Sequence, residues 1–270
     1  MENIQETIEE LITWLKEKVD NAGAKGLVFG LSGGVDSAVL AGVSKLAFPD
    51  TSLGLIMPCH SDQMDEEHAL IVAKDLESKI EKIDLTASFD TMMEVLEYKD
   101  NTLAIANIKP RLRMTTLYYY AQNMNYLVAG ASNKSEFTVG YFTKHGDSGV
   151  DLLPLAEFLK TEIWELAEYL DIPEIIINKA PSAGLWNNQT DEDEMGFSYQ
   201  LLDKYIDTKI AEENIKTKIE TMYDKSIHKR EYPPIFNRNK NGWNIFKAML
   251  LYIGYIIRRV KLDGRAFKME

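Results

Sequence analysis

The distribution of apolar residues predicts a chain of alternating helices and strands. Helical spacing begins over residues 2–21, where one face carries Ile4, Ile8, Leu11, Ile12, Leu15 and Val19. Short apolar runs predict buried strands at 27–31, 52–57 and 126–131, and an alternating pattern predicts a short strand at 80–85. Further helical patterns predict helices at 35–47, 62–78, 88–97, 101–123, 158–172, 195–207 and 211–225. This alternation is typical of a parallel sheet with helices on both faces, so we expect a doubly wound α/β fold.

Two polar stretches directly follow predicted strands. LSGGVDS occupies 31–37 and GASNKSE occupies 130–136. Ligands of doubly wound folds bind beyond the carboxyl ends of the strands, so we expect both stretches at a single site. Residues 178–196 combine Pro, Gly and Asn with an acidic run, which predicts a mobile loop.

Composition and charge limit the classes of function. The chain has 270 residues, 45% hydrophobic and 27% charged, as expected for one large domain or two small ones. Cys59 is the single cysteine, and the N-terminus lacks the apolar core of a signal peptide, so we expect a cytoplasmic protein. The net charge of −12 argues against a nucleic-acid groove over most of the protein, and we expect no nucleic-acid partner.

The C-terminal part differs from the rest in charge. Residues 225–270 carry eleven Lys or Arg against three Asp or Glu. Within them, 243–260 form an apolar face with a basic end, and the longest apolar run has ten residues, too few to span a bilayer. We expect this helix to pack on the core or on a partner subunit. A helix lying at a membrane interface is the alternative, and membrane association is not our expectation.

The stretch SGGVDS has the properties of an anion-binding loop. Gly33 and Gly34 leave the backbone bare at a predicted helix start, and Ser32 and Ser37 add hydroxyl donors. The loop lacks the Gly-Lys-Ser/Thr ending of the familiar phosphate loop. Asp36 would repel a polyphosphate unless a cation lay between them, so we expect Asp36 to hold Mg²⁺.

SGGVDS resembles the loop of the N-type ATP pyrophosphatases, the PP-loop family. The resemblance implies a Rossmann-like, adenine nucleotide alpha hydrolase-like fold and substrate activation by adenylation. The loop alone leaves several enzymes open, among them GMP synthetase, tRNA-modifying thiolases and NAD synthetase. It also implies that the ATP-binding residues of the loop are Gly30, Leu31, Ser32, Gly33, Gly34, Val35, Asp36 and Ser37.

Further segments narrow the resemblance to ammonia-dependent NAD synthetases. They are NIKPRLRM (107–114), GASNKSE (130–136), GYFTKHGDSGVDLLPL (140–155), KTE (160–162), KAPSAGL (179–185), QTDEDEMG (189–196) and HKR (228–230). The resemblance covers a domain of residues 1–236 and fades over an extension at 237–270. It implies amidation of deamido-NAD by ammonia with ATP, giving NAD, AMP and pyrophosphate. Because no module of glutaminase size is visible, we expect free ammonia as the nitrogen donor.

The resemblance also implies further site residues and a homodimer. Glu136 would be the second Mg²⁺ ligand, beside Asp36. The additional ATP-binding residues would be Met57, Ala131, Lys160 and Ser182, although Ala131 stands where most relatives have Thr. The deamido-NAD contacts would be Arg111, Lys144, Asp151, His228 and Lys229.

Two alternatives to this function stay open from the sequence. One is another PP-loop adenylating enzyme, such as a tRNA-modifying thiolase or the synthetase subunit of an amidotransferase. The acidic body and the absence of paired cysteines weigh against a thiolase. The other is a nucleotide-binding module without catalysis, and the intact Asp36, Glu136, Lys144 and Asp151 weigh against it.

Overall fold

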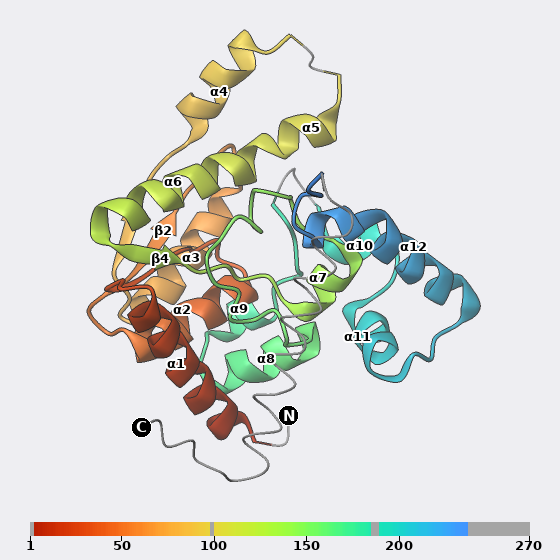
Figure 1. Ribbon diagram of the computed structural model, residues 1–270, viewed down its shortest axis with the longest axis horizontal. Helices are drawn as coiled ribbons and strands as arrows, with labels where there is room; N and C mark the ends of the chain where they lie inside the picture. Colours follow the sequence, from red (N-terminus) through yellow and green to blue (C-terminus); the bar gives the residue numbers. More distant parts are fainter. Residues whose placement is uncertain (1–2, 98–99, 185–188, 237–270) are drawn as a thin grey trace, which may run out of the picture. The chain divides into compact units, whose positions relative to one another are not determined.

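A computed structural model describes residues 3–97, 100–184 and 189–236 (Figure 1). One compact unit runs from Met1 to Arg230 and a second from Glu231 to Glu270. The predicted extension at 237–270, with its amphipathic helix, lies outside the described residues. The sheet and the site described below belong entirely to the first unit.

The sheet has four parallel strands in the order β3-β2-β1-β4. The strands are β1 (Gly26–Gly30), β2 (Ser52–Ile56), β3 (Ile80–Lys82) and β4 (Tyr126–Val128). β1 pairs with β2 on one side and with β4 on the other, so Val28 lies opposite both Leu53 and Val128. The chain therefore reverses its direction of travel across the sheet at β1, and ligands of such folds bind at this kind of position.

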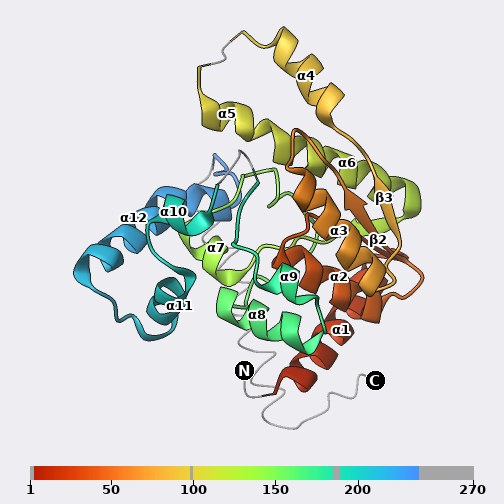
Figure 2. The same ribbon diagram turned by 180° about the vertical axis from the view of Figure 1, so that it is seen from behind.

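Helices cover both faces of the sheet, which confirms the predicted doubly wound α/β fold. Leu27 and Phe29 of β1 belong to one apolar core, whereas the intervening Val28 belongs to another, as expected for a strand buried on both faces. Figure 2 shows the helices of the first core gathered together. The first core includes α1 (Ile4–Asn21), α2 (Val35–Ala47), α3 (Gln63–Asp75), α8 (Lys160–Tyr169) and α9 (Glu174–Ile177). The second includes α4 (Thr86–Val95), α5 (Thr102–Ala106) and α6 (Ile108–Met124).

The remaining helices form a third cluster around α7, the helix that follows β4. They are α7 (Lys134–Val139), α10 (Asp191–Met195), α11 (Tyr199–Thr208) and α12 (Glu213–Arg230). Val139, Met195 and Tyr199 are buried together at its centre. The cluster brings residues from the last third of the described chain to the helix that begins at the sheet edge.

Most predicted elements are confirmed, and the differences have local causes. The helix at 35–47 has the predicted bounds. The strand expected at 126–131 ends at Val128, and the next residue, Ala129, pairs with Leu152 in an isolated bridge. The helix expected at 101–123 is two helices that meet at Asn107.

The loop expected at 178–196 contains α10, whose start is capped by the side chain of Thr190. Among the described residues, no helix is both long enough and apolar enough to cross a membrane.

Candidate active site

A cavity of about 780 Å³ opens at the carboxyl edge of the sheet. Gly30, Ile56 and Ala129, at the ends of β1, β2 and β4, all line it. The segments 140–147 and 179–184 supply further walls. Its volume lies within the usual range for small-molecule and cofactor sites.

The loop after β1 is held by its own serines. Ser37 Oγ donates to the carbonyl of Gly34 at 2.9 Å and accepts from the amide of Ser32 at 3.2 Å. Gly34 is the N-cap residue of α2 and provides no side-chain cap. The first amide hydrogens of α2 therefore have no acceptor within the helix, as an anion-binding helix start requires.

Gly33 explains why this loop needs glycine. Its φ of +78° lies in the left-handed region. A Cβ at this position would lie 2.3 Å from the carbonyl oxygen of Asp65 and 2.9 Å from the amide nitrogen of Ala69. Gly33 is packed against the first turns of α3, so it shapes the loop without lining the cavity.

The loop after β4 is connected to the first loop by one side chain. Asn133 Oδ1 accepts from the amide of Glu136 at 2.9 Å and so caps α7. Asn133 Nδ2 donates to Asp36 Oδ1 at 2.8 Å. The start of α7 and the first turn of α2 are therefore fixed relative to each other, so the two loops lie together as expected.

Three charged groups meet where the loops join. The ammonium group of Lys160 contacts Asp36 Oδ2 and lies 3.3 Å from Glu136 Oε1. The Lys160 side chain is 2% exposed, against 18% for Asp36 and 16% for Glu136. One buried cation thus joins the two carboxylates that we expected to bind Mg²⁺.

The surroundings shift the pKa values of this group. Burial, then the negative charge of Asp36, raise the pKa of Glu136 to about 8, although Lys160 opposes the shift. Burial alone would lower the pKa of Lys160, but the carboxylates of Asp36 and Glu136 hold it above its ordinary value. These mutual shifts indicate that the lysine stays charged and that Glu136 holds its proton more readily than an ordinary carboxyl group.

A third carboxylate lies next to this group. Tyr199 donates to Asp191 Oδ2 at 2.9 Å and lies 3.4 Å from Glu136 Oε1. Asp191 is 3% exposed and lines the cavity, and its other oxygen, Oδ1, has no hydrogen-bond partner among the described residues. Burial raises the pKa of Asp191, with the tyrosine hydrogen bond opposing. The sheet end of the cavity therefore gathers three carboxyl groups around one lysine.

Asp203 on α11 hydrogen-bonds to residues adjacent to Glu136 and Lys160. Its carboxylate accepts from the hydroxyl of Ser135 and from the amide of Thr161 at 2.9 Å. The same Ser135 hydroxyl accepts from the amide of Lys160 at 2.9 Å. Asp203 is 3% exposed. One buried carboxylate thereby connects the residue before Glu136 with the first residues of α8.

Cations at the other end of the cavity bind backbone carbonyls. Arg111 donates to the carbonyl of Lys144 at 3.2 Å, and the Lys144 ammonium contacts the carbonyl of His228. Lys229 donates to the carbonyls of Gly140 and Phe142, each at 2.8 Å. These contacts gather α6, the segment after α7 and the end of α12 around one part of the cavity.

The structure brings nearly all the predicted site residues to this cavity. The exceptions are Gly33 and Asp151. Asp151 accepts from the amide of Val128 at 2.8 Å and from the hydroxyl of Tyr118 at 3.1 Å, so its carboxylate supports β4. The individual binding roles stay predictions for Gly30, Leu31, Ser32, Gly33, Gly34, Val35, Asp36, Ser37, Met57, Ala131, Glu136, Lys160, Ser182, Arg111, Lys144, Asp151, His228 and Lys229.

Sequence reasoning missed several residues of the site. Asn133 was identifiable as a helix cap in GASNKSE, and Asp191 belongs to an acidic run that we interpreted as part of a loop. Lys179 follows α9 and lines the cavity. Asp203 is 68 residues from its partner Ser135, and no sequence pattern indicates that contact.

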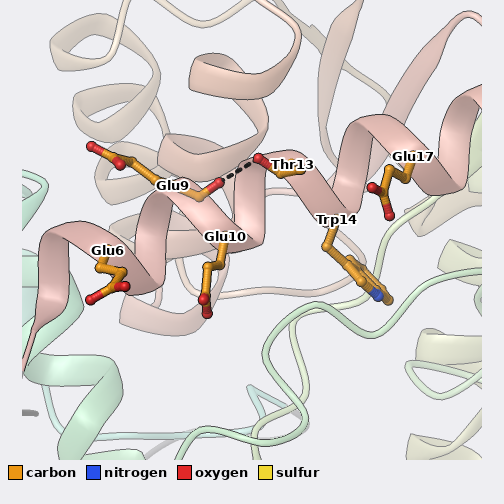
Figure 3. A pocket seen from close by; sticks show the side chains of 6 residues that line it. All are labelled: Glu6, Glu9, Glu10, Thr13, Trp14 and Glu17. Carbon is orange, nitrogen blue, oxygen red and sulfur yellow. Dashed lines mark hydrogen bonds between the residues drawn. The ribbon is translucent and has the colours of Figure 1, made fainter. Parts of the chain in front are cut away.

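A separate, acidic hollow lies on the outer face of α1 (Figure 3). Glu6, Glu9, Glu10 and Glu17 line it with Thr13 and Trp14, and Thr13 donates to the backbone carbonyl of Glu9 at 2.9 Å. Four carboxylates repel phosphate, so this hollow is no alternative to the nucleotide site.

The fold and the cavity define a class of protein. A switch point between β1 and β4, a glycine-serine loop at a helix start and paired carboxylates at the same edge are the features of an α/β nucleotide-binding protein. The family model described as NAD synthase matches residues 7–233, and the chain belongs to this family. The match does not favour a tRNA-modifying thiolase or another PP-loop enzyme.

Curated relatives agree with the family model over most of the chain. An NH(3)-dependent NAD(+) synthetase from Finegoldia magna is 50% identical over 245 residues, covering 89% of this chain and 100% of the relative. An NH(3)-dependent NAD(+) synthetase from Carboxydothermus hydrogenoformans is 51% identical over 237 residues, covering 86% of this chain and 98% of the relative.

Solved structures share the fold. An NMN synthetase from Francisella tularensis superposes with a TM-score of 0.84 at 37% identity, covering 87% of this chain and 99% of that one. An NH3-dependent NAD synthetase from Campylobacter jejuni superposes with a TM-score of 0.75 at 30% identity. The match covers 87% of this chain and 99% of that one.

Proposed function

We propose that this protein is a carbon–nitrogen ligase that amidates the nicotinate carboxylate of deamido-NAD with ammonia, at the expense of ATP. The observation that carries the proposal is the joining of Asp36 and Glu136 by Lys160 at one edge of the sheet, beside a helix start with bare amides. Membership of the NAD synthase family and the names of the curated relatives support the choice of substrate.

The reaction needs two steps, because the oxide ion is a poor leaving group from a carboxylate. A carboxylate oxygen of the substrate attacks the α-phosphorus of ATP, the bond to the β-phosphate oxygen breaks, and pyrophosphate leaves with that electron pair. Ammonia then attacks the acyl adenylate, the carbon–oxygen bond to AMP breaks, and nitrogen loses a proton. The amides at the start of α2 and the Lys160 ammonium would stabilise the charge on pyrophosphate.

We propose Mg²⁺ as the cation of this site, with Asp36 and Glu136 as its protein ligands. Both carboxylates contact one ammonium group, so a single cation reaches both. Within the described ranges, no three or more His, Cys, Asp or Glu side chains gather as a metal site. Phosphate oxygens and water would complete the ligands, an arrangement that Mg²⁺ prefers. When bound, the ion would neutralise charge on the phosphates.

We also propose a homodimer that works in the cytoplasm, without a nucleic-acid partner. The dimer is supported by the resemblance to ammonia-dependent NAD synthetases. The cytoplasmic location is supported by Cys59, the single cysteine, which is a free, buried thiol. Size-exclusion chromatography with light scattering tests the dimer, and a monomer at all concentrations would contradict it.

A second candidate substrate is the mononucleotide. The Francisella relative is described as an NMN synthetase and superposes with a TM-score of 0.84. The same chemistry would then amidate nicotinate mononucleotide. The cavity end with Arg111, Lys144 and Lys229 would contact a single nucleotide in place of a dinucleotide.

One set of assays separates these proposals. The purified protein is incubated with ATP, Mg²⁺ and ammonium, and with either deamido-NAD or nicotinate mononucleotide, and the amide product and AMP are measured. We expect faster amidation of deamido-NAD. Faster amidation of nicotinate mononucleotide would identify the mononucleotide as the substrate. If neither compound led to AMP formation, both proposals would be refuted. Glutamine in place of ammonium should support no amidation by the purified chain.

A further inference from the structure

The phosphate loop contains no basic residue, so positive charge must reach it from elsewhere. Six Lys or Arg side chains line the cavity within the described part of the chain: Arg111, Arg113, Lys144, Lys160, Lys179 and Lys229. Lys160 is bound by two carboxylates. Arg113 donates to the carbonyl of Met57 at 3.0 Å and to Ser61 Oγ at 3.1 Å. Arg111, Lys144 and Lys229 bind carbonyls at the other end of the cavity.

Lys179 is the remaining cation, and it touches the loop itself. Its ammonium lies 3.4 Å from the carbonyl oxygen of Gly33 and 2.6 Å from Asp65 Oδ1. The Lys179 side chain is 21% exposed and lines the cavity. An ammonium group has three hydrogen-bond donors, and these contacts use two of them.

The surroundings hold Lys179 at this place. Gly33 packs against α3, where a Cβ would collide with the carbonyl oxygen of Asp65. Asp65 is therefore fixed beside the loop and pairs with the lysine. The segment 179–184 also carries Ser182, a predicted ATP contact, and Gly184, where an added Cβ would lie 3.6 Å from Asp65 Oδ2. The ammonium is thus positioned by the loop and by the helix beneath it.

We propose that Lys179 binds the β- and γ-phosphates of ATP and the pyrophosphate product, in place of the lysine that the familiar phosphate loop carries in its own sequence. The proposal rests on the proposed function for the identity of the phosphate ligand. The geometry supports it: the Lys179 ammonium touches the carbonyl oxygen of Gly33 in the phosphate loop, whereas Lys160 is held between Asp36 and Glu136.

Calorimetric titration with inorganic pyrophosphate and Mg²⁺ tests this role directly. Lys179→Met should weaken pyrophosphate binding at least tenfold, because it removes a charged hydrogen bond. Binding of AMP, which lacks the β- and γ-phosphates, should change less than twofold. Lys179→Arg keeps the charge and should recover most of the pyrophosphate affinity. Unchanged pyrophosphate binding by Lys179→Met would overturn the proposal.

Two further variants exclude a purely structural effect. Asp65→Asn breaks the same ion pair but keeps the ammonium and removes a negative charge near the phosphates, so pyrophosphate affinity should fall clearly less than in Lys179→Met. Equal losses in Asp65→Asn and Lys179→Met would show that only the ion pair matters and would overturn the proposal. Lys82→Met removes another lysine paired with α3, through Glu66 at 2.5 Å, and should not alter pyrophosphate binding.

The activity assay keeps the two proposals distinguishable. If the wild type forms NAD but Lys179→Met binds pyrophosphate normally, the role of Lys179 is wrong and the function stands. If the wild type forms no amide but binds pyrophosphate through Lys179, the function is wrong and the phosphate site stands.

Discussion

The two ends of the cavity hold their charged side chains in different ways. At the sheet end, the Lys160 ammonium pairs with both Asp36 and Glu136, and the lysine is almost fully buried. At the other end, Arg111 and His228 are exposed, and the cations there donate to backbone carbonyls. Removing one member of a buried charge cluster costs about 3–5 kcal/mol, whereas exposed cations can exchange a carbonyl for a ligand at little cost. The sheet end is therefore preorganised for chemistry, and the other end is adaptable for binding.

The largest expected loss of activity comes from a substitution at the sheet end of the cavity. Asp36→Asn leaves Lys160 with one carboxylate and removes a proposed Mg²⁺ ligand. We expect pyrophosphate release with deamido-NAD and ammonia to fall by about 1,000-fold or more, from the cost of an unbalanced buried charge and the loss of metal binding. A thermal melt of the same preparation controls for folding. Turnover at the wild-type rate would refute the metal role of Asp36.

The second-largest expected effect tests whether the charged residues at the sheet end depend on the hydrogen bonds of Asp203. Asp203→Asn replaces one acceptor by a donor, so either the Thr161 amide or the Ser135 hydroxyl loses its partner. We expect kcat and the affinity for MgATP to fall by about tenfold to 100-fold, because Glu136 and Lys160 lose their alignment. Calorimetry should find deamido-NAD binding unchanged.

Tyr205→Phe is the matched control for Asp203→Asn. It removes the 2.7 Å hydrogen bond from Tyr205 on the same helix to Glu220, away from the cavity. We expect a lower melting temperature and an unchanged affinity for MgATP. Equal losses of MgATP affinity in both variants would indicate that Asp203 only stabilises α11.

A smaller effect on substrate binding should be confined to the end of the cavity away from the sheet. Arg111→Met removes an exposed guanidinium that donates to the carbonyl of Lys144. We expect the KM for deamido-NAD to rise about tenfold, the value of one charged hydrogen bond, with little change in kcat or in the KM for ATP. Steady-state kinetics with each substrate varied in turn provide the measurement. A comparable rise in the KM for ATP would contradict the separation of the two ends.

The smallest effect concerns Ala131, where the resemblance implies that most relatives have Thr. Ala131 lines the cavity in the loop after β4. Ala131→Thr would add a hydroxyl donor near the expected position of ATP, and one neutral hydrogen bond is worth about 1 kcal/mol. We expect MgATP to bind about fivefold more tightly, measured by calorimetry. Weaker binding would indicate that the extra methyl group obstructs the nucleotide.

Local sequence patterns predicted the elements and the loops well, because each depends on neighbouring residues. The helix at 35–47 was placed correctly because an uninterrupted apolar face follows the glycine turn. Charge spacing was less informative: the acidic run that contains α10 has few apolar residues to reveal a helix. The assignment of Asp151 as a ligand contact came from resemblance alone. In the structure, its carboxylate accepts hydrogen bonds from the amide of Val128 in β4 and from the hydroxyl of Tyr118.

Contacts between distant segments could not be predicted. Lys179 is 146 residues from Gly33, and Asp203 is 68 residues from Ser135. Neither pair has a spacing that a periodic element would impose. Their meeting depends on how the third helical cluster packs against α7 and on how α9 packs against α3. Such contacts are a property of the complete fold.

Asn133 gives the protein a built-in reporter of nucleotide binding. Its amide nitrogen is bonded to Asp36, and its amide oxygen holds the start of α7. Any ligand that draws the Asp36 carboxylate toward itself must alter the electronic environment of that side-chain NH₂ group. In a ¹⁵N-labelled sample its pair of resonances would therefore report occupancy of the phosphate loop, with no dye and no substitution in the cavity.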